Sequence, residues 1–245
     1  MLRKASRCRL AAIIVAAFIQ TAVFTSSSQA AFILTLNDST TAGPNVVIID
    51  DDVVLDGNLD TGVIEFSGSL SGTVWKYNYT IGFSKPVLSH PDKPKVRKMD
   101  LFSVNVSSDG PGELLITLTD TDFMLPQSDR WNFKHLIGGT TDGTVTADAF
   151  IDLDNMESGM GLTPGTLGPF GPGAFSDTAG LQIDDPDATD PFSMTQKVTI
   201  VHTDDGKNIT SFDSELIVTA PEPGTIAMFG VGLAVLGYAQ RRRAA

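Results

Sequence analysis

Acidic side chains are the main groups in this chain whose type and spacing suggest chemistry. They cluster at Asp50 to Asp52, Asp56 to Asp60, Asp120 with Asp122, Asp152 to Asn155, and Asp184 to Asp187. Asp56, Asn58 and Asp60 match the first half of a calcium loop, but Thr61 replaces the turn glycine and Ser67 the bidentate glutamate. The spacing therefore excludes an EF-hand. Calcium bridging through Asp56, Asn58 and Asp60 stays open beside the ordinary use of Asp and Asn in turns.

Histidines and paired acids are the other catalytic candidates. His90, His135 and His202 lie far apart in the sequence, whereas a zinc site needs ligands at short spacing or converging in space. We expect each to be a surface or capped histidine. Paired carboxylates would suit a glycosidase, but the chain has too many acids for the sequence to identify a pair. No nucleophile elbow or phosphate loop is recognisable, so we predict no catalytic residues and no enzyme.

Aromatic residues alternate along two segments. Trp75, Tyr77 and Tyr79 are predicted to share one face of a strand with Ile81 and Phe83, and Trp131 and Phe133 to share a face of another. Such residues pack in a core or, when exposed, stack on sugar rings. We expect core packing, and a carbohydrate platform is the alternative.

The charge of the body limits its partners. Without the seven basic residues near the two ends and without Glu222, residues 31–220 hold 10 basic and 28 acidic residues, a net charge of −18. Nucleic acid is therefore excluded as a partner, because phosphate contacts need a cationic face. A basic island at Lys93, Lys95, Arg97 and Lys98 is expected to be a solvated loop, with docking of an acidic polymer as the alternative.

The body is predicted to be all-β. Period-two alternation and turn-forming residues indicate nine or ten strands and no confident helix. The expected strands lie at 32–36, 46–55, 63–66, 74–83, 102–106, 114–118, 145–153, 198–202 and 216–219. They predict an antiparallel two-sheet sandwich of jelly-roll or immunoglobulin-like type. Asn155 to Gly180, with seven glycines and three prolines, is expected to be a mobile loop.

Residues 1–30 have the pattern of a secretory signal peptide. A basic start precedes the apolar run Leu10 to Val23, and Ser28 and Ala30 are the small residues that a signal peptidase reads. We predict cleavage after Ala30, with Ala31 as the alternative. The only cysteine, Cys8, lies before the apolar run, so no disulfide or cysteine-based metal site is expected in the body.

The C-terminal segment has the pattern of a membrane anchor. Thr225 to Gln240 carries no charged side chain and would span about 24 Å as a helix. Three arginines, Arg241, Arg242 and Arg243, follow it directly and suit a headgroup layer. The alternative is a buried C-terminal core element. The basic residues at both ends of the chain place the body outside the inner membrane.

The same tail resembles the PEP-CTERM sorting signal of exported bacterial proteins, through Pro221, Glu222 and Pro223, the apolar span and the terminal arginines. The resemblance implies recognition by exosortase and covers only about 25 residues. Segments of the body also resemble uncharacterised PEP-CTERM proteins, which implies no known activity. They are Asp100 to Ser107, Ile116 to Phe123, Ile137 to Thr141 and Phe212 to Leu216.

Together these features predict a signal peptide at 1–30, a sandwich domain at 31–219 and a sorting and transmembrane segment at 220–245. We expect an exported protein whose precursor is anchored in the inner membrane and is then released to the cell envelope or the extracellular matrix. A structural or binding role is expected, and the resemblance to PEP-CTERM proteins implies that it is associated with exopolysaccharide. A carbohydrate-binding or calcium-dependent lectin-like module is the alternative. Signal peptidase, exosortase, the membrane and polysaccharide are the expected partners, and calcium is the only cofactor left open.

Overall fold

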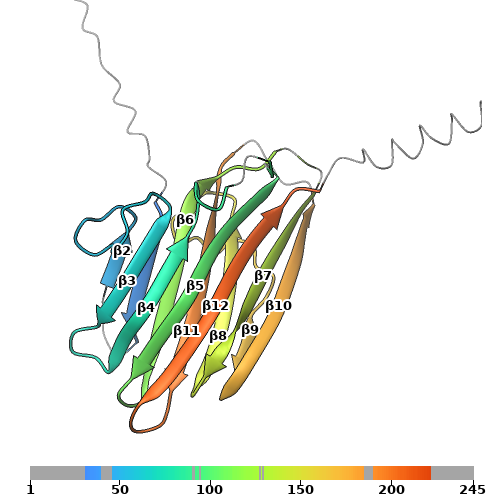
Figure 1. Cartoon of the computed structure of the whole chain (residues 1–245). Helices are drawn as coiled ribbons and strands as arrows, with labels where there is room; N and C mark the ends of the chain where they lie inside the picture. Colours follow the sequence, from blue (N-terminus) through green and yellow to red (C-terminus); the bar gives the residue numbers. More distant parts are fainter. Residues whose placement is uncertain are drawn as a thin grey trace, which may run out of the picture.

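The chain folds into two packed β-sheets (Figure 1). The computed structural model describes residues 31–39, 46–89, 92–93, 95–126, 128, 130–184 and 190–221. The strands in these ranges are β1 Ile33–Asp38, β2 Val46–Ile49, β3 Val63–Ser69, β4 Trp75–Phe83, β5 Val96–Ser108, β6 Gly112–Phe123, β7 Arg130–Thr141, β8 Thr144–Asp152, β9 Leu167–Phe170, β10 Gly173–Asp184, β11 Phe192–His202 and β12 Asn208–Thr219. The prediction of an all-β antiparallel sandwich is confirmed.

Each sheet has six strands, and every described pairing is antiparallel. The first sheet has the order β2-β1-β6-β11-β8-β9 and the second the order β10-β7-β12-β5-β4-β3. The short turns after β5, β7 and β11 each lead from one sheet to the other at the same end, which we call the turn end. The opposite end, which we call the loop end, holds the connections after β2, β4, β6, β8 and β10. The described chain also begins and ends there (Figure 1).

Alternating apolar residues fill the space between the sheets. Along β8, Val145, Ala147, Ala149 and Ile151 are all buried, and the residues between them are not. Aromatic rings close the core near the loop end, where the ring of Phe192 lies 5.1 Å from Trp131 and 5.7 Å from Phe123. Burial of this apolar surface is the main source of the fold's stability, since the described body has no cysteine.

Polar contacts also join the two sheets. The Gln196 amide of β11 donates to the Met99 carbonyl of β5 at 2.9 Å. At the loop end, Lys85 Nζ lies 2.8 Å from Asp120 Oδ1 and 4.4 Å from the centre of the Phe123 ring. The Asp120 side chain is only 1% exposed. Because a buried charge is costly unless it is paired, this ion pair fixes the end of β4 to β6.

Three sequence predictions need correction. The described chain has twelve strands rather than nine or ten, and β2 covers only Val46–Ile49 of the strand expected at 46–55. The Gly-rich segment Asn155 to Gly180 is not a single loop, because it contains β9 and most of β10. These two edge strands bury few side chains, so glycine and proline are tolerated there.

The prediction that five residues of β4 share one face is also wrong. Trp75 and Tyr77 are buried, but the pairing with β5 shifts register on either side of Tyr79. Beyond this irregularity Gly82 faces the other sheet, where an added Cβ would meet Leu118. Tyr79 and Phe83 therefore face away from the core, whereas Ile81 is buried.

Candidate functional site: a polar groove on one sheet

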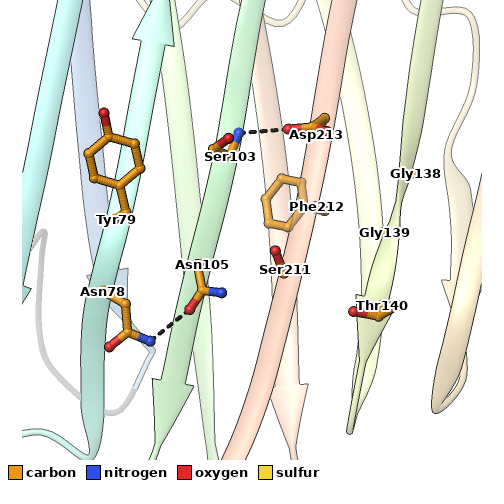
Figure 2. Close-up of a pocket in the computed structure, with 10 residues that line it drawn as sticks. All are labelled: Asn78, Tyr79, Ser103, Asn105, Gly138, Gly139, Thr140, Ser211, Phe212 and Asp213. Carbon is orange, nitrogen blue, oxygen red and sulfur yellow. Dashed lines mark hydrogen bonds between the residues drawn. The ribbon is translucent and has the colours of Figure 1, made fainter.

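A groove crosses the outer face of the second sheet. It has a volume of about 650 Å³ and runs over β4, β5, β12 and β7 (Figure 2). Its lining residues are Asn78, Tyr79, Ser103, Asn105, Gly138, Gly139, Thr140, Ser211, Phe212 and Asp213. None of these ten is a lysine or an arginine, and most are uncharged polar residues or glycines. The groove therefore offers hydrogen-bonding groups with one carboxylate.

One side of the groove is formed by β4, at the point where its pairing with β5 shifts register. This shift turns Asn78 and Tyr79 outward, and the Tyr79 ring stands over the sheet with the residue 37% exposed (Figure 2). The Asn78 amide donates to the Asn105 side-chain carbonyl at 2.7 Å. This bond fixes both side chains across β4 and β5. Each amide can offer its other polar atom to a ligand.

The Asp213 carboxylate of the groove is positioned by a bulge between β5 and β12. The pairing of these strands shifts register between Phe212 and Ser214, so that Phe102 and Ser103 stand opposite the single residue Asp213. Ser103 has a φ of 53°, a conformation that is uncommon outside glycine and costs energy. Its backbone N–H donates to Asp213 Oδ1 at 2.6 Å. This hydrogen bond fixes the position of Asp213 in the groove.

Glycines keep the β7 side of the groove open. At Gly139, an added Cβ would lie 2.2 Å from the Ser211 carbonyl oxygen and 2.7 Å from the Phe212 Cα. Only glycine permits β7 and β12 to approach this closely. Gly138, its neighbour, lines the groove without a side chain.

Further toward the loop end the face becomes acidic. A second hollow of about 490 Å³ shares Asp213 with the groove and is also lined by Asp100, Phe102 and Glu215. Burial, followed by the nearby charges of Glu215 and Asp213, raises the pKa of Asp100 to about 6. The Phe102 side chain is 44% exposed beside these acids. This face therefore combines exposed rings, amides and carboxylates within a few residues of one another.

The calcium candidates act as turn caps in the structure. Asp56 Oδ1 accepts the backbone N–H groups of Asn58 at 3.0 Å and Glu65 at 2.9 Å, and Asn58 Oδ1 accepts that of Asp60 at 2.8 Å. These bonds order the connection between β2 and β3. Across the described part of the chain, no group of three or more His, Cys, Asp or Glu side chains is placed to hold a metal ion.

Of the two expected environments, surface or capped, His135 and His202 have the second, because both are buried and each bonds at least one hydroxyl group. His202 Nδ1 lies 2.8 Å from Ser108 Oγ, and its Nε2 lies 2.8 Å from Thr210 Oγ1. Ser108 has 0% exposure, so a substrate has no access to its hydroxyl. This network joins β11 to β5 and β12 and supports the sandwich. His90 lies outside the described residues.

The aromatic prediction is confirmed for Trp75, Tyr77, Trp131 and Phe133, which are all core residues. Tyr79 is the exception. The sequence did not single out the other groove residues as a site. Three of the body segments that resemble uncharacterised PEP-CTERM proteins supply all of them except Asn78 and Ser211, namely Asp100 to Ser107, Ile137 to Thr141 and Phe212 to Leu216.

The predicted processing residues lie at the loop end or beyond the described chain. Ala31 donates its backbone N–H to Thr121 Oγ1 at 3.0 Å, and Ala220 donates to the Lys95 carbonyl at 2.9 Å. Pro221 follows as the last described residue. The other predicted processing residues, Ala30, Glu222, Pro223 and Arg241 to Arg243, lie outside the described residues. Within the described ranges, no helix is long and apolar enough to cross a membrane.

Several solved structures match the chain, all at low sequence identity and low TM-score. A complex of TmCBM61 with β-1,4-galactotriose has 9% identity and a TM-score of 0.26, and the match covers 61% of this chain and 90% of that chain. The K1 adhesin domain of Lys-gingipain from Porphyromonas gingivalis W83 has 9% identity and a TM-score of 0.32, with 68% and 95% covered. Particles derived from infectious bursal virus have 16% identity and a TM-score of 0.36, with 78% and 54% covered. No curated protein matches the chain.

The C-terminal segment carries a known sorting motif. Residues 219–243 match the PEP-CTERM protein-sorting motif. The motif implies export, processing by exosortase and sorting to the cell surface or the extracellular space. The chain therefore carries a PEP-CTERM sorting motif directly after its β-sandwich.

Proposed function

We propose that the sandwich is a polysaccharide-binding module that the PEP-CTERM tail delivers to the cell envelope or the extracellular matrix. The observation that carries this proposal is the groove over β4, β5, β12 and β7, with paired amides, a fixed carboxylate and an exposed tyrosine. Sugar hydroxyls form hydrogen bonds with amides and carboxylates, and the apolar faces of sugar rings pack on aromatic rings. An open groove also suits an extended polysaccharide chain better than a small compact ligand.

The delivery route in this proposal has three steps. Signal peptidase removes residues 1–30, with cleavage after Ala30 or Ala31. The segment 220–245 holds the precursor in the inner membrane, with Arg241, Arg242 and Arg243 at the headgroup layer. Exosortase then recognises Pro221, Glu222 and Pro223 and releases the sandwich, which joins the exopolysaccharide outside the cell.

The chemistry of the groove favours a neutral polysaccharide over other polymers. Nucleic acids and strongly anionic glycans would meet Asp213 in the groove and Asp100 beside it, and the nearby Lys98 is already paired with Glu215. Catalysis is not part of the proposal. Asp100 could transfer a proton only to a substrate bond within its reach. The role that we propose for the groove residues is binding.

Affinity gel electrophoresis of the exported protein against neutral, uronic-acid-containing and amino-sugar polysaccharides tests this function. We expect retardation by at least one neutral polysaccharide, because amides and a stacking ring recognise uncharged hydroxyl-rich chains. Tyr79→Ala should abolish most of the retardation, and Asn105→Ala should reduce it, because each removes a lining side chain. Asn132→Ala is the matched control, because the Asn132 side chain is exposed on β7 outside the groove. This variant should bind like the parent.

Two results would refute the proposal. One is mobility that no polysaccharide changes. The other is equal retardation of the parent, Tyr79→Ala and Asn132→Ala, which would place binding elsewhere on the chain. Thermal melting of each variant checks that the sandwich stays folded, since all three substitutions are on the outer face of the sheet.

A further inference from the structure

The two ends of the sandwich differ in their exposed side chains. The turns at 109–111, 142–143 and 203–207 contain no large apolar residue, and the nearest exposed one is Ile209 on β12. The loop end carries most of the exposed large apolar residues of the described chain. They are Ile49, Val53, Val54, Leu55, Leu59, Val87, Met124, Leu153 and Met156.

Two loops expose these residues most strongly. In the connection after β2, Val53 is 79% exposed and its neighbour Val54 is 81% exposed. In the connection after β8, Met156 is 60% exposed, and its carbonyl accepts the Ser193 hydroxyl at 2.7 Å. Single exposed apolar residues are ordinary on protein surfaces, but a concentration at one end of a molecule indicates a contact surface.

The position of the chain's end identifies what covers this surface. Ala220 is tied to Lys95 at the loop end by the 2.9 Å backbone hydrogen bond, and Pro221 is the last described residue. Only three residues, 222–224, lie between Pro221 and the apolar sequence Thr225 to Gln240. The four Cα–Cα steps from Pro221 to Thr225 span at most about 14 Å when fully extended. If that segment is in a bilayer, the loop end must lie close to the bilayer surface.

The loop end carries charged side chains of both signs, with acids in excess. Asp51 and Asp52 precede Val53, whereas Lys93 and Lys95 lie beside the point where the tail leaves. A surface that carries both signs suits zwitterionic headgroups, which also carry both, better than a strongly anionic bilayer.

We propose that the loop end docks on the surface of a zwitterionic lipid bilayer while the precursor is tethered by its tail. This inference rests on the anchoring step of the proposed function. Val53, Val54 and Met156 enter the headgroup region and add contact area to the tether. Because the strands run from the loop end to the turn end (Figure 1), both sheets then stand away from the membrane. The groove faces sideways and stays open to polysaccharide.

Site-specific fluorescence on the full-length chain tests the docking. The chain carries Cys8→Ser, is purified from the inner membrane of a host without exosortase, and is reconstituted in phosphatidylethanolamine and phosphatidylcholine vesicles. An environment-sensitive dye is attached at Val54→Cys, Met156→Cys, Lys207→Cys or Ala234→Cys, one site per sample. Lys207 is the matched control at the turn end, and Ala234 reports on the tail itself.

Spin-labelled lipid should quench the dye severalfold at residues 54, 156 and 234 and leave the dye at residue 207 unchanged. Val53→Ser should weaken the quenching at residue 156, because it removes part of the contact. Quenching at 234 without quenching at 54 and 156 would overturn the docking and leave the anchoring intact. Absence of quenching at 234 would overturn the anchoring step and the docking with it. Equal quenching at 54 and 207 would contradict the proposed upright orientation.

Discussion

Acid should destabilise the sandwich through His135, and replacing this histidine should remove the effect. His135 lies on β7 with 0% exposure; its Nε2 contacts Ser214 Oγ at 3.1 Å, and its Nδ1 has no hydrogen-bond partner in the described structure. Burial lowers the pKa of His135 from 6.5 to about 4. The native state therefore keeps the ring neutral at a pH at which the unfolded chain has already taken up a proton.

The sign and size of the effect follow from this difference. Between pH 6.5 and 4 the unfolded state binds more protons than the native state, so stability falls as the pH falls. The contribution is fully present above pH 6.5 and is lost progressively down to pH 4. At about 1.4 kcal/mol per pKa unit, the loss at this one residue is about 3 kcal/mol. This is a large part of the stability of an ordinary domain, which is about 5–15 kcal/mol.

Urea denaturation of the parent and of His135→Leu at pH 7, 6, 5 and 4 measures the effect, with Trp75 and Trp131 as buried probes. At pH 7 the variant should be less stable, because Ser214 loses a hydrogen bond. Relative to the parent, the variant should gain about 3 kcal/mol between pH 7 and pH 4. Phe133→Leu is the matched control, because it changes a buried residue of β7 that does not titrate. Its stability difference from the parent should not depend on pH. An equal difference at pH 7 and pH 4 for His135→Leu would refute the reasoning.

Further predictions concern the loops and the groove. Lys85→Met should lower the free energy of unfolding by about 3–5 kcal/mol at pH 7, because it leaves the buried Asp120 carboxylate without its cationic partner. Urea denaturation should show part of this stability recovered at acid pH. Unchanged stability at pH 7 would contradict the pairing. Gly139→Ala should destabilise by about 1–3 kcal/mol, because its Cβ would lie 2.2 Å from a carbonyl oxygen. Gly180→Ala, whose nearest contact is 3.6 Å away, should be nearly neutral in the same melting assay, and equal costs at the two glycines would contradict this account. Asp56→Ala should lower the free energy of unfolding by about 1–3 kcal/mol with or without millimolar calcium, because the carboxylate accepts backbone N–H groups. A loss of stability that appears only with calcium would favour a metal site.

Asp100 gives a further prediction of opposite sign. Its pKa is raised to about 6, so between pH 6 and the ordinary value of 3.8 the native state binds more protons than the unfolded state. This contribution to stability grows as the pH falls and partly offsets that of His135. Asp100→Asn should therefore make the acid loss of stability steeper in the same denaturation series. A shallower loss would contradict the raised pKa.

The strands were predictable from the sequence where one face of a strand is buried in full. Val145, Ala147, Ala149 and Ile151 alternate along one face and are all buried, whereas Phe150 between the last two is only partly buried. The same reasoning failed for Gly173 to Asp184, because this edge strand buries only Ile183 and covers Phe175 and Leu181 in part, so its other residues can be small and polar. Period-two patterns report burial, and a strand with little burial leaves little pattern.

The groove was not predictable, because it depends on pairing between distant segments. The outward turn of Tyr79 results from the register shifts between β4 and β5, and Asp213 is positioned by the bulge at Ser103. A single sequence contains the residues of a bulge without marking where the partner strand requires one. Asn78 and Asn105 look like ordinary turn or surface residues until their two strands are paired.

The most direct test of the central claim is a titration of the ¹⁵N-labelled exported protein with exopolysaccharide isolated from its own host, followed by amide chemical shifts. Binding in the groove should shift the resonances of Tyr79, Asn105, Gly139 and Asp213, which line it. The amide of Thr199, on the first sheet, should not move. Shifts confined to the first sheet, or none at saturating polysaccharide, would contradict the account.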